Sequence, residues 1–218
     1  PQVHVLNSSV NEEDCDTTFA IMGARLATDI RKFIMNKCPQ LADPADCSRI
    51  SCIGHSVGSI VIRVALASPL LAVYRPKMHT FLSLFSPHLG TTYVPSVLVS
   101  TGLWAMRRFQ HVHIMDELHL QDAQTPEECF MYKLSNRGGF ADFKHVILVS
   151  GHQDQYVPLH SALSCIPSMC EKDEIVGPTI ISMAANLIST IDPSRIIRVT
   201  LDQVFPKLTF DTIIGRAA

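Results

Sequence analysis

The chain has 218 residues, of which 47% are hydrophobic and 17% are charged. This length suits one sizeable domain spanning residues 1–218, and the high apolar share excludes an intrinsically disordered chain. The 18 Lys and Arg residues nearly balance the 20 Asp and Glu residues and form no basic run, which argues against a nucleic-acid partner.

The N-terminal part predicts a strand, a helix and a turn. Residues 3–6 alternate between polar and apolar in the manner of a strand. After the candidate N-cap residues Asp16 and Thr17, apolar residues recur at steps of three and four up to Pro39, which predicts an amphipathic helix. Proline and aspartate in residues 41–48 then indicate a turn.

The remaining elements predict an α/β fold. Helical spacing of apolar residues continues through residues 60–66 and 179–191. Strands that are apolar on both faces and alternate with helices predict a mostly parallel sheet with helices on both faces. Short apolar runs of this kind cover residues 50–53, 80–85, 146–149 and 196–201.

Residues 91–137 interrupt this alternation. The segment contains no clear strand, and it carries Leu103, Trp104, Met106 and Phe109. We interpret it as a mainly helical, lid-like insertion over the sheet. Its apolar side chains, Leu103 and Trp104 among them, predict an apolar pocket for a substrate, although simple packing on the domain is an equal alternative.

One motif points to chemistry. Gly54-His55-Ser56-Val57-Gly58 matches G-x-S-x-G and falls between a predicted strand and a predicted helix, as a nucleophile elbow requires. Ser56 is then the nucleophile, and the Val57 amide at the helix N-terminus is an oxyanion donor. The flanking glycines would avoid a collision of strand and helix. The alternative is a glycine-bounded turn whose serine caps the helix.

The acid is easier to place than the base. Asp154 follows the predicted strand 146–149, at the sheet edge where α/β folds carry their sites. The alternative is a turn aspartate that accepts loop amides. The order serine, acid, histidine calls for a histidine after Asp154, but only His160 follows it, on the same loop. We treat His55 and His88 as candidate substrate contacts. His111 and His113 lack a third ligand nearby, so we expect no metal.

Several segments together resemble the lipase-like serine esterases of the DUF676 type, in the α/β-hydrolase superfamily, which also occur as C-terminal domains of large eukaryotic proteins. The resemblance implies an α/β-hydrolase fold with Ser56 as nucleophile and Asp154 as acid. The chain departs from the motif at Val57, where Leu is common, and at Ser59, where Gly is common. The similar segments are the elbow and the runs at 86–91, 100–104, 154–158, 161–162 and 214–218.

The resemblance also implies what this chain lacks. In the family, a His-Gly loop with the second oxyanion donor precedes the segment matching residues 3–6, and the triad histidine follows the segment matching 215–218. Residue 1 is Pro, and no targeting composition precedes the first apolar run, so we expect an internal fragment of a larger polypeptide. The chain alone is then not expected to complete a hydrolytic cycle.

These observations lead to one prediction of function. We expect a serine esterase that cleaves a lipophilic carboxylic ester through an acyl-enzyme on Ser56, without a cofactor. Its partner would be a small-molecule or lipid ester, with peripheral membrane contact left open. Seven scattered cysteines without a C-x-x-C pair favour a cytoplasmic protein. A catalytically silent binding module and a thioester or amide hydrolase are the alternatives.

Overall fold

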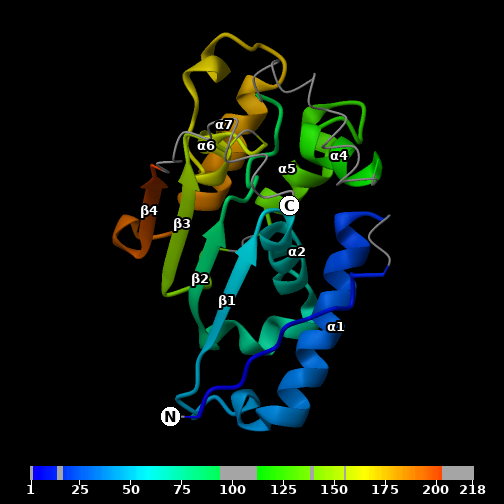
Figure 1. Cartoon of the computed structure of the whole chain (residues 1–218), viewed down its shortest axis with the longest axis vertical. Coiled ribbons are helices and arrows are strands. Elements are labelled where there is room, and N and C mark those ends of the chain that lie inside the picture. Colours follow the sequence, from blue (N-terminus) through cyan, green and yellow to red (C-terminus); the bar gives the residue numbers. More distant parts are fainter. Residues whose placement is uncertain (1, 14–16, 94–111, 138–139, 155, 203–218) are drawn as a thin grey trace, which may run out of the picture.

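A computed structural model describes residues 2–13, 17–93, 112–137, 140–154 and 156–202. Four strands form one fully parallel sheet in the order β1-β2-β3-β4 (Figure 1). Helices connect the strands, which confirms the predicted α/β class. The strands are β1 (Ile50–His55), β2 (Met78–Leu84), β3 (His145–Gly151) and β4 (Ile196–Leu201).

The strand predicted at residues 3–6 is wrong. These residues have no regular structure, and the side chains of Val3 and Val5 are 80% and 77% exposed. In Figure 1 this segment passes β1 without joining the sheet. An alternating pattern becomes a strand only where a neighbouring backbone accepts its hydrogen bonds, and no such pairing forms within the described residues.

Three long helices build the core against the sheet. They are α1 (Phe19–Lys37), α2 (Val57–Leu66) and α7 (Gly177–Ile188). Thr18, one residue after the expected caps, accepts a hydrogen bond from the Ile21 amide and begins α1. Helix α1 lies close to α2, because a Cβ on Gly23 would lie only 2.2 Å from Cγ1 of Val64. Fully buried side chains from helices and strands meet in this layer: Phe19, Ile60, Phe81, Val146 and Ile180.

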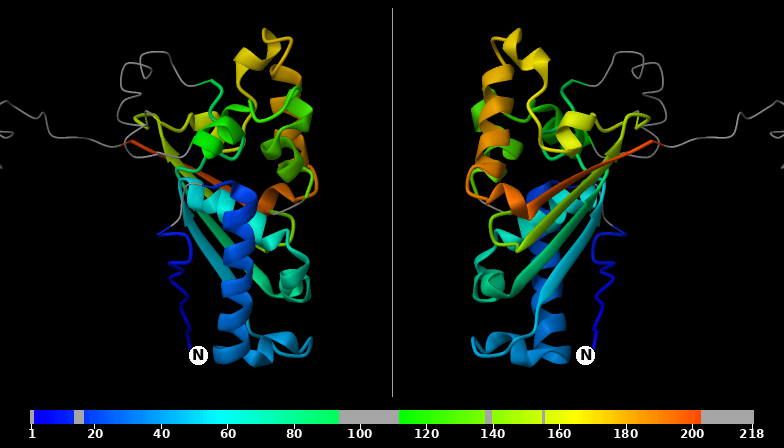
Figure 2. Two further views of the ribbon diagram at one scale, coloured as in Figure 1. Left: turned by 90° about the vertical axis from the view of Figure 1, so that its right-hand side faces the viewer. Right: turned by 90° about the vertical axis from the view of Figure 1, so that its left-hand side faces the viewer.

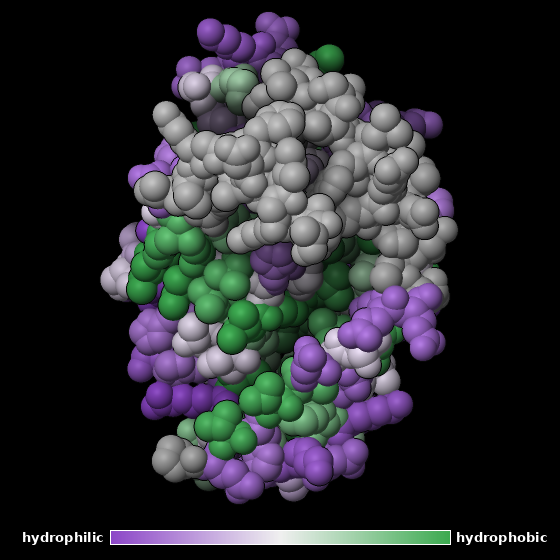
Figure 3. Space-filling view, in the orientation of Figure 1, coloured by the Kyte–Doolittle hydropathy of each residue, from purple (hydrophilic) through white to green (hydrophobic). Residues whose placement is uncertain are grey.

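The other face of the sheet carries no helix within the described residues, so the prediction of helices on both faces holds on one side only there (Figure 2). Ile53 and Ile197 are 69% and 47% exposed, whereas Phe81 and Val146 on the helix side are fully buried. Figure 3 shows hydrophobic residues gathered over the strands. An open apolar face is unusual for a parallel sheet, which proteins normally cover on both sides.

The described part of residues 91–137 is helical, as predicted, and contains no strand. Ile114 and Met131 are buried in the main core, and the Glu117 carboxylate accepts the Phe19 amide at 2.9 Å. Residues 94–111, with Leu103 and Trp104, lie outside the described residues, so the role as a lid stays a prediction. The helices here are α4 (Val112–His119), η4 (Pro126–Glu128) and α5 (Phe130–Ser135).

Short helical turns complete the described chain. Among the described residues, no single helix is long and apolar enough to span a membrane. The α2 and η2 helices meet that length and composition only as a pair bent by 97°. The short elements are η1 (Pro39–Ala42), η2 (Pro69–Lys77), α6 (Leu159–Ala162), η5 (Ser168–Glu171) and η6 (Pro193–Arg195).

Candidate active site

Ser56 forms the sharp turn between β1 and α2. Strand β1 ends at His55 and α2 begins at Val57, so one residue reverses the chain. Ser56 has φ 53° and ψ −133°, a left-handed conformation that residues other than glycine rarely adopt. Its amide donates to the Leu84 carbonyl at 2.9 Å, and its carbonyl accepts from the Ser59 amide at 3.2 Å. The surrounding backbone therefore holds a strained residue in place.

The Ser56 side chain makes no capping hydrogen bond to α2. The alternative interpretation, a serine whose hydroxyl caps the helix, therefore does not describe this turn. The residue is partly exposed at the end of the strand. Its hydroxyl is thus not used to cap the helix that it precedes.

The two motif glycines differ in what they do. A Cβ on Gly54 would lie 2.4 Å from the Ser59 Oγ and 2.7 Å from the Ser59 Cα, so this position requires glycine. A Cβ on Gly58 would meet no atom of the described residues within 4 Å. The predicted steric role is therefore correct for Gly54 and wrong for Gly58 within the described structure. The difference arises because α2 crosses β1 at Ser59 rather than at Gly58.

Val57 is the first residue of α2. The amides of a first helical turn have no acceptor within their own helix, and the helix dipole places partial positive charge there. The amide of Val57 directly follows Ser56 and belongs to this group. Its role as an oxyanion donor stays a prediction.

Asp154 lies at the same sheet edge as Ser56. Leu84 of β2 pairs with His55 on one side and with Val149 on the other, so Ser56 and Asp154 follow strands that flank β2. Two strand spacings separate these strands by roughly 10 Å. Asp154 Oδ1 accepts the amides of Tyr156 at 2.8 Å and Val157 at 3.1 Å. Through its Oδ1 atom the aspartate therefore organises its own loop.

His88 lies in the core rather than at the site surface. Its ring has no exposed area, with Nε2 2.8 Å from Ser83 Oγ and Nδ1 3.5 Å from Arg63 Nη1. Burial, and then the positive charge of Arg63, hold the pKa of His88 well below its ordinary value, so the ring is neutral. A ring without exposed surface offers no face to a substrate. The prediction that His88 binds substrate is therefore wrong, and its role in this structure is structural.

The hydrogen bonds continue from His88 to the first turn of α2. Ser59 Oγ lies 3.2 Å from Ser83 Oγ and accepts from Ser86 Oγ at 2.7 Å. This network connects α2, β2 and the loop after β2 directly beneath the Ser56 turn. Sequence reasoning missed it, although a serine-rich run around a histidine is a signal that could have indicated it.

Arg63 is an unusual member of this network. Its side chain is 1% exposed, and its guanidinium lies 5.5 Å from the centre of the Phe140 ring. Nε and Nη2 have no hydrogen-bond partner within the described residues. Burial lowers the pKa of Arg63 to about 9. Burial removes the guanidinium from water at a cost in free energy, and attraction to the Phe140 ring offsets part of that cost.

Among the described residues, no histidine bridges Ser56 and Asp154. His55 is exposed at the end of β1, with its ring centre 6.4 Å from that of Phe85, and its substrate contact stays a prediction. The ring of His160 on α6 lies 5.9 Å from that of Tyr93. Within the described residues, no histidine ring is hydrogen-bonded to Ser56 Oγ or to the Asp154 carboxylate.

No metal centre is evident in the described part of the chain, where no group of three or more His, Cys, Asp or Glu side chains could hold an ion. His111 lies outside the described residues, so the His111 and His113 pair is not placed by the structure.

A comparison with protein families finds one matching model. The family described as Putative serine esterase (DUF676) matches residues 1–171. The match includes β1, β2 and β3 together with the Ser56 turn and the Asp154 loop.

Proposed function

The chain belongs to the serine esterase family DUF676, and from this premise we propose that it is a serine hydrolase whose nucleophile is Ser56. The observation that supports this most is the backbone of Ser56, with a positive φ in a one-residue turn between strand and helix. A strained residue with an uncapped hydroxyl at the carboxyl edge of a parallel sheet suits nucleophilic attack.

In the proposed reaction, a general base removes the Ser56 hydroxyl proton while Oγ attacks the carbonyl carbon of an ester. The carbonyl electron pair moves to oxygen, and the Val57 amide donates to that oxyanion. The tetrahedral intermediate collapses and expels the alcohol, which takes the proton from the base. Water then attacks the acyl-enzyme by the same route and releases the acid. Asp154 orients the base and stabilises its protonated form.

We propose that a histidine in the rest of a larger polypeptide supplies the base, together with the second oxyanion donor. His160 is the only histidine that follows Asp154 in the 218 residues. It lies against Tyr93, and burial lowers its pKa. Six residues separate it from the acid, which is short for a base that must also reach Ser56.

We propose a lipophilic carboxylic ester as the substrate and a cytoplasmic location, with peripheral membrane contact left open. The apolar composition around Leu103 and Trp104 supports an acyl pocket. His55, exposed beside Ser56, is the proposed contact to the bound ester.

Fluorophosphonate labelling of the full-length protein tests this proposal, because the reagent modifies activated serines. We expect wild-type protein to be labelled and Ser56→Ala to lose label, with ester hydrolysis falling on the order of 10⁴-fold or more. Ser51→Ala, at an exposed serine of β1, is the matched control and should label normally.

The alternatives give different outcomes. Folded full-length protein that takes no label would identify a silent binding module and overturn the proposal. Label on Ser56 together with turnover of thioesters or amides, but not of esters, would retain the nucleophile and correct the substrate class.

A further inference from the structure

A cavity of about 430 Å³ opens at the amino edge of the sheet, opposite to Ser56 and Asp154. It lies where β1, β2 and β3 begin, among residues from the loop before β1, from η2 and from the turn before β3. Its volume falls in the range of small-molecule sites. Its polar and charged lining residues are Asp46, Ser48, Arg49, Lys77, His79 and Lys144.

The lining carries an excess of positive charge. Arg49, Lys77 and Lys144 are cations, and Asp46 is the one carboxylate among the lining residues. The Asp46 carboxylate is already engaged by Ser48, whose amide donates to it at 2.8 Å. Within the described residues, the ion pairs include none of the three cations. An anion in the cavity would offset this charge.

Lys77 places a positive charge inside the wall of the cavity. The residue is 8% exposed, and its Nζ donates to the carbonyls of Pro44, at 3.3 Å, and Asp46. The two carbonyls solvate the ammonium, and hydrogen bonds from Ser48, and then the charge of Lys77, lower the pKa of the Asp46 carboxylate. The lining still carries three cations and one carboxylate, so its net positive charge favours an anionic ligand.

Arg49 and His79 form a donor–acceptor pair on the rim. Arg49 Nη1 lies 3.0 Å from His79 Nε2, and His79 Nδ1 lies 2.9 Å from Thr80 Oγ1. Since arginine only donates, Nε2 accepts and the ring is neutral. Desolvation, and then the charges of Arg49, His145 and Lys144, lower the pKa of His79. An anion would relieve the repulsion among these groups.

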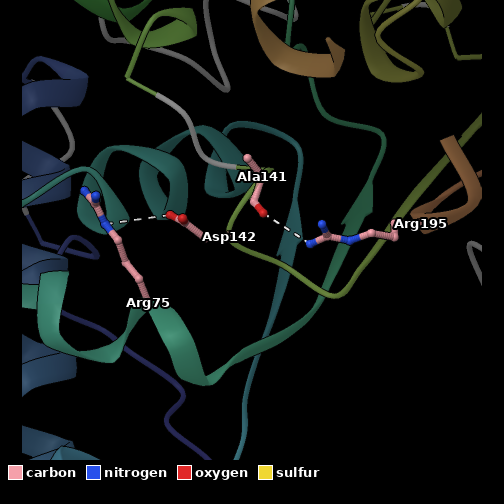
Figure 4. A network of polar contacts seen from close by, with 4 residues as sticks. All are labelled: Arg75, Ala141, Asp142 and Arg195. Atoms are coloured by element: carbon pink, nitrogen blue, oxygen red, sulfur yellow. Dashed lines mark hydrogen bonds and ion pairs between the residues drawn. The ribbon is translucent and has the colours of Figure 1, made fainter. Parts of the chain in front are cut away.

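The turn that carries Lys144 is held from two sides. Arg195 donates to the carbonyls of Ala141, at 3.2 Å, and Lys144, at 3.3 Å, while Arg75 pairs with Asp142 at 3.7 Å (Figure 4). These contacts hold the backbone of the turn at Lys144 in the absence of a ligand, which lowers the entropic cost of binding there.

From this arrangement we propose that the cavity at the amino edge of the sheet binds the phosphate group of a small phosphate monoester. A guanidinium and two ammonium groups that line a pocket of this size suit a doubly charged tetrahedral anion. The site is separate from the Ser56 edge and does not depend on the proposed hydrolase activity. The same phosphate chemistry occurs in soluble compounds and in the headgroup of phosphatidic acid.

Calorimetric titration with inorganic phosphate tests the site in the full-length protein. We expect saturable binding to the wild type, at least tenfold weaker binding to Arg49→Gln/Lys144→Gln, and less than a twofold change in Lys133→Gln/Lys172→Gln. The control pair removes the same charge from exposed positions that do not line the cavity. Equal weakening in both double variants, or no binding to wild type, would overturn the proposal.

Two further measurements sharpen the result. Added phosphate should shift the imidazole resonances of His79 in the wild-type protein but not those of the exposed His4, a readout that needs no variant. Co-sedimentation with phosphatidylcholine vesicles, with and without 10% phosphatidic acid, distinguishes the source. Wild-type binding that depends on phosphatidic acid and is lost in Arg49→Gln/Lys144→Gln indicates a lipid headgroup, and phosphate binding without vesicle binding indicates a soluble ligand.

Discussion

Ser56 and its neighbours show how single residues set up the candidate site. The positive φ of Ser56 costs on the order of 1–3 kcal/mol, and hydrogen bonds to Leu84 and Ser59 hold it. Gly54 makes room for Ser59 beneath the turn, whereas Gly58 faces open space in the described structure. Asp154 satisfies two loop amides with one oxygen. The roles of Gly54, Gly58 and Asp154 can each be tested by one small substitution.

Alanine at the two motif glycines should change stability in opposite directions. Gly54→Ala forces a Cβ against the Ser59 backbone, so we expect a loss of about 1–3 kcal/mol in the free energy of unfolding. Gly58→Ala, inside α2, should gain up to about 1 kcal/mol because alanine favours the helix and meets no neighbour. Urea denaturation measures both, and equal losses would contradict the assigned difference.

Asp154→Asn should separate the structural role of Asp154 in its loop from its proposed role in catalysis. The Asn carbonyl can still accept the Tyr156 and Val157 amides, so we expect the melting temperature of Asp154→Asn to stay within about 2 °C of wild type. Without the negative charge, fluorophosphonate labelling of the full-length protein should slow by at least a hundredfold. Unchanged labelling would leave Asp154 with a structural role only.

At the scale of elements, buried polar links hold the site edge together. Ser59, Ser83 and His88 connect α2 to β2, and Arg63 contacts both His88 and the Phe140 ring. Glu117 connects α4 to the first residue of α1 by accepting the Phe19 amide. The described helices of the insertion are thus part of the core rather than an independent flap.

Glu117 should make stability depend on pH. Burial raises the pKa of Glu117 to about 7, although the hydrogen bond from the Phe19 amide opposes the shift, whereas its ordinary pKa is 4.5. The folded state therefore holds the proton more tightly, and this group's contribution to stability is lost as pH rises from about 4.5 to 7. Glu117→Gln, which resembles the protonated form, should gain stability relative to wild type over that window, by at most about 1.4 kcal/mol per pH unit.

Thermal melts of wild type and Glu117→Gln between pH 4.5 and 8 measure this dependence. Glu128→Gln, at an exposed carboxyl, controls for the loss of one charge. A constant difference in stability between Glu117→Gln and wild type across the window would show that Glu117 is ionised throughout.

At the scale of the whole molecule, the sheet has one face covered by helices and, within the described residues, one open face. The two opposite edges carry different chemistry, with Ser56 and Asp154 at the carboxyl ends of the strands and the cationic cavity at the amino ends. One parallel sheet can thus present two separate ligand sites, because the loops at the carboxyl ends of its strands and those at the amino ends lie on opposite edges.

Threonine substitutions on the two faces of the sheet should lower the free energy of unfolding by different amounts. Ile53→Thr on the open face should change the free energy of unfolding of this chain by less than about 0.5 kcal/mol, since Ile53 is 69% exposed. Val146→Thr keeps the side-chain shape but buries a hydroxyl in the core, so we expect a loss of about 1–3 kcal/mol. A large loss for Ile53→Thr would show that this face is covered in solution.

The sequence by itself determined the features that depend on neighbouring residues. Apolar runs located all four strands, and the Gly54 to Gly58 motif located the strand-to-helix turn, because periodicity and turn chemistry act over a few residues. Only the tertiary structure decided that His88 is buried and that, among the described residues, segment 3–6 pairs with no strand and Gly58 has no close neighbour. It also brought Arg49, Lys77 and Lys144 to one cavity. These outcomes depend on which distant segments meet, and that is set by how the helices and strands pack rather than by any local pattern.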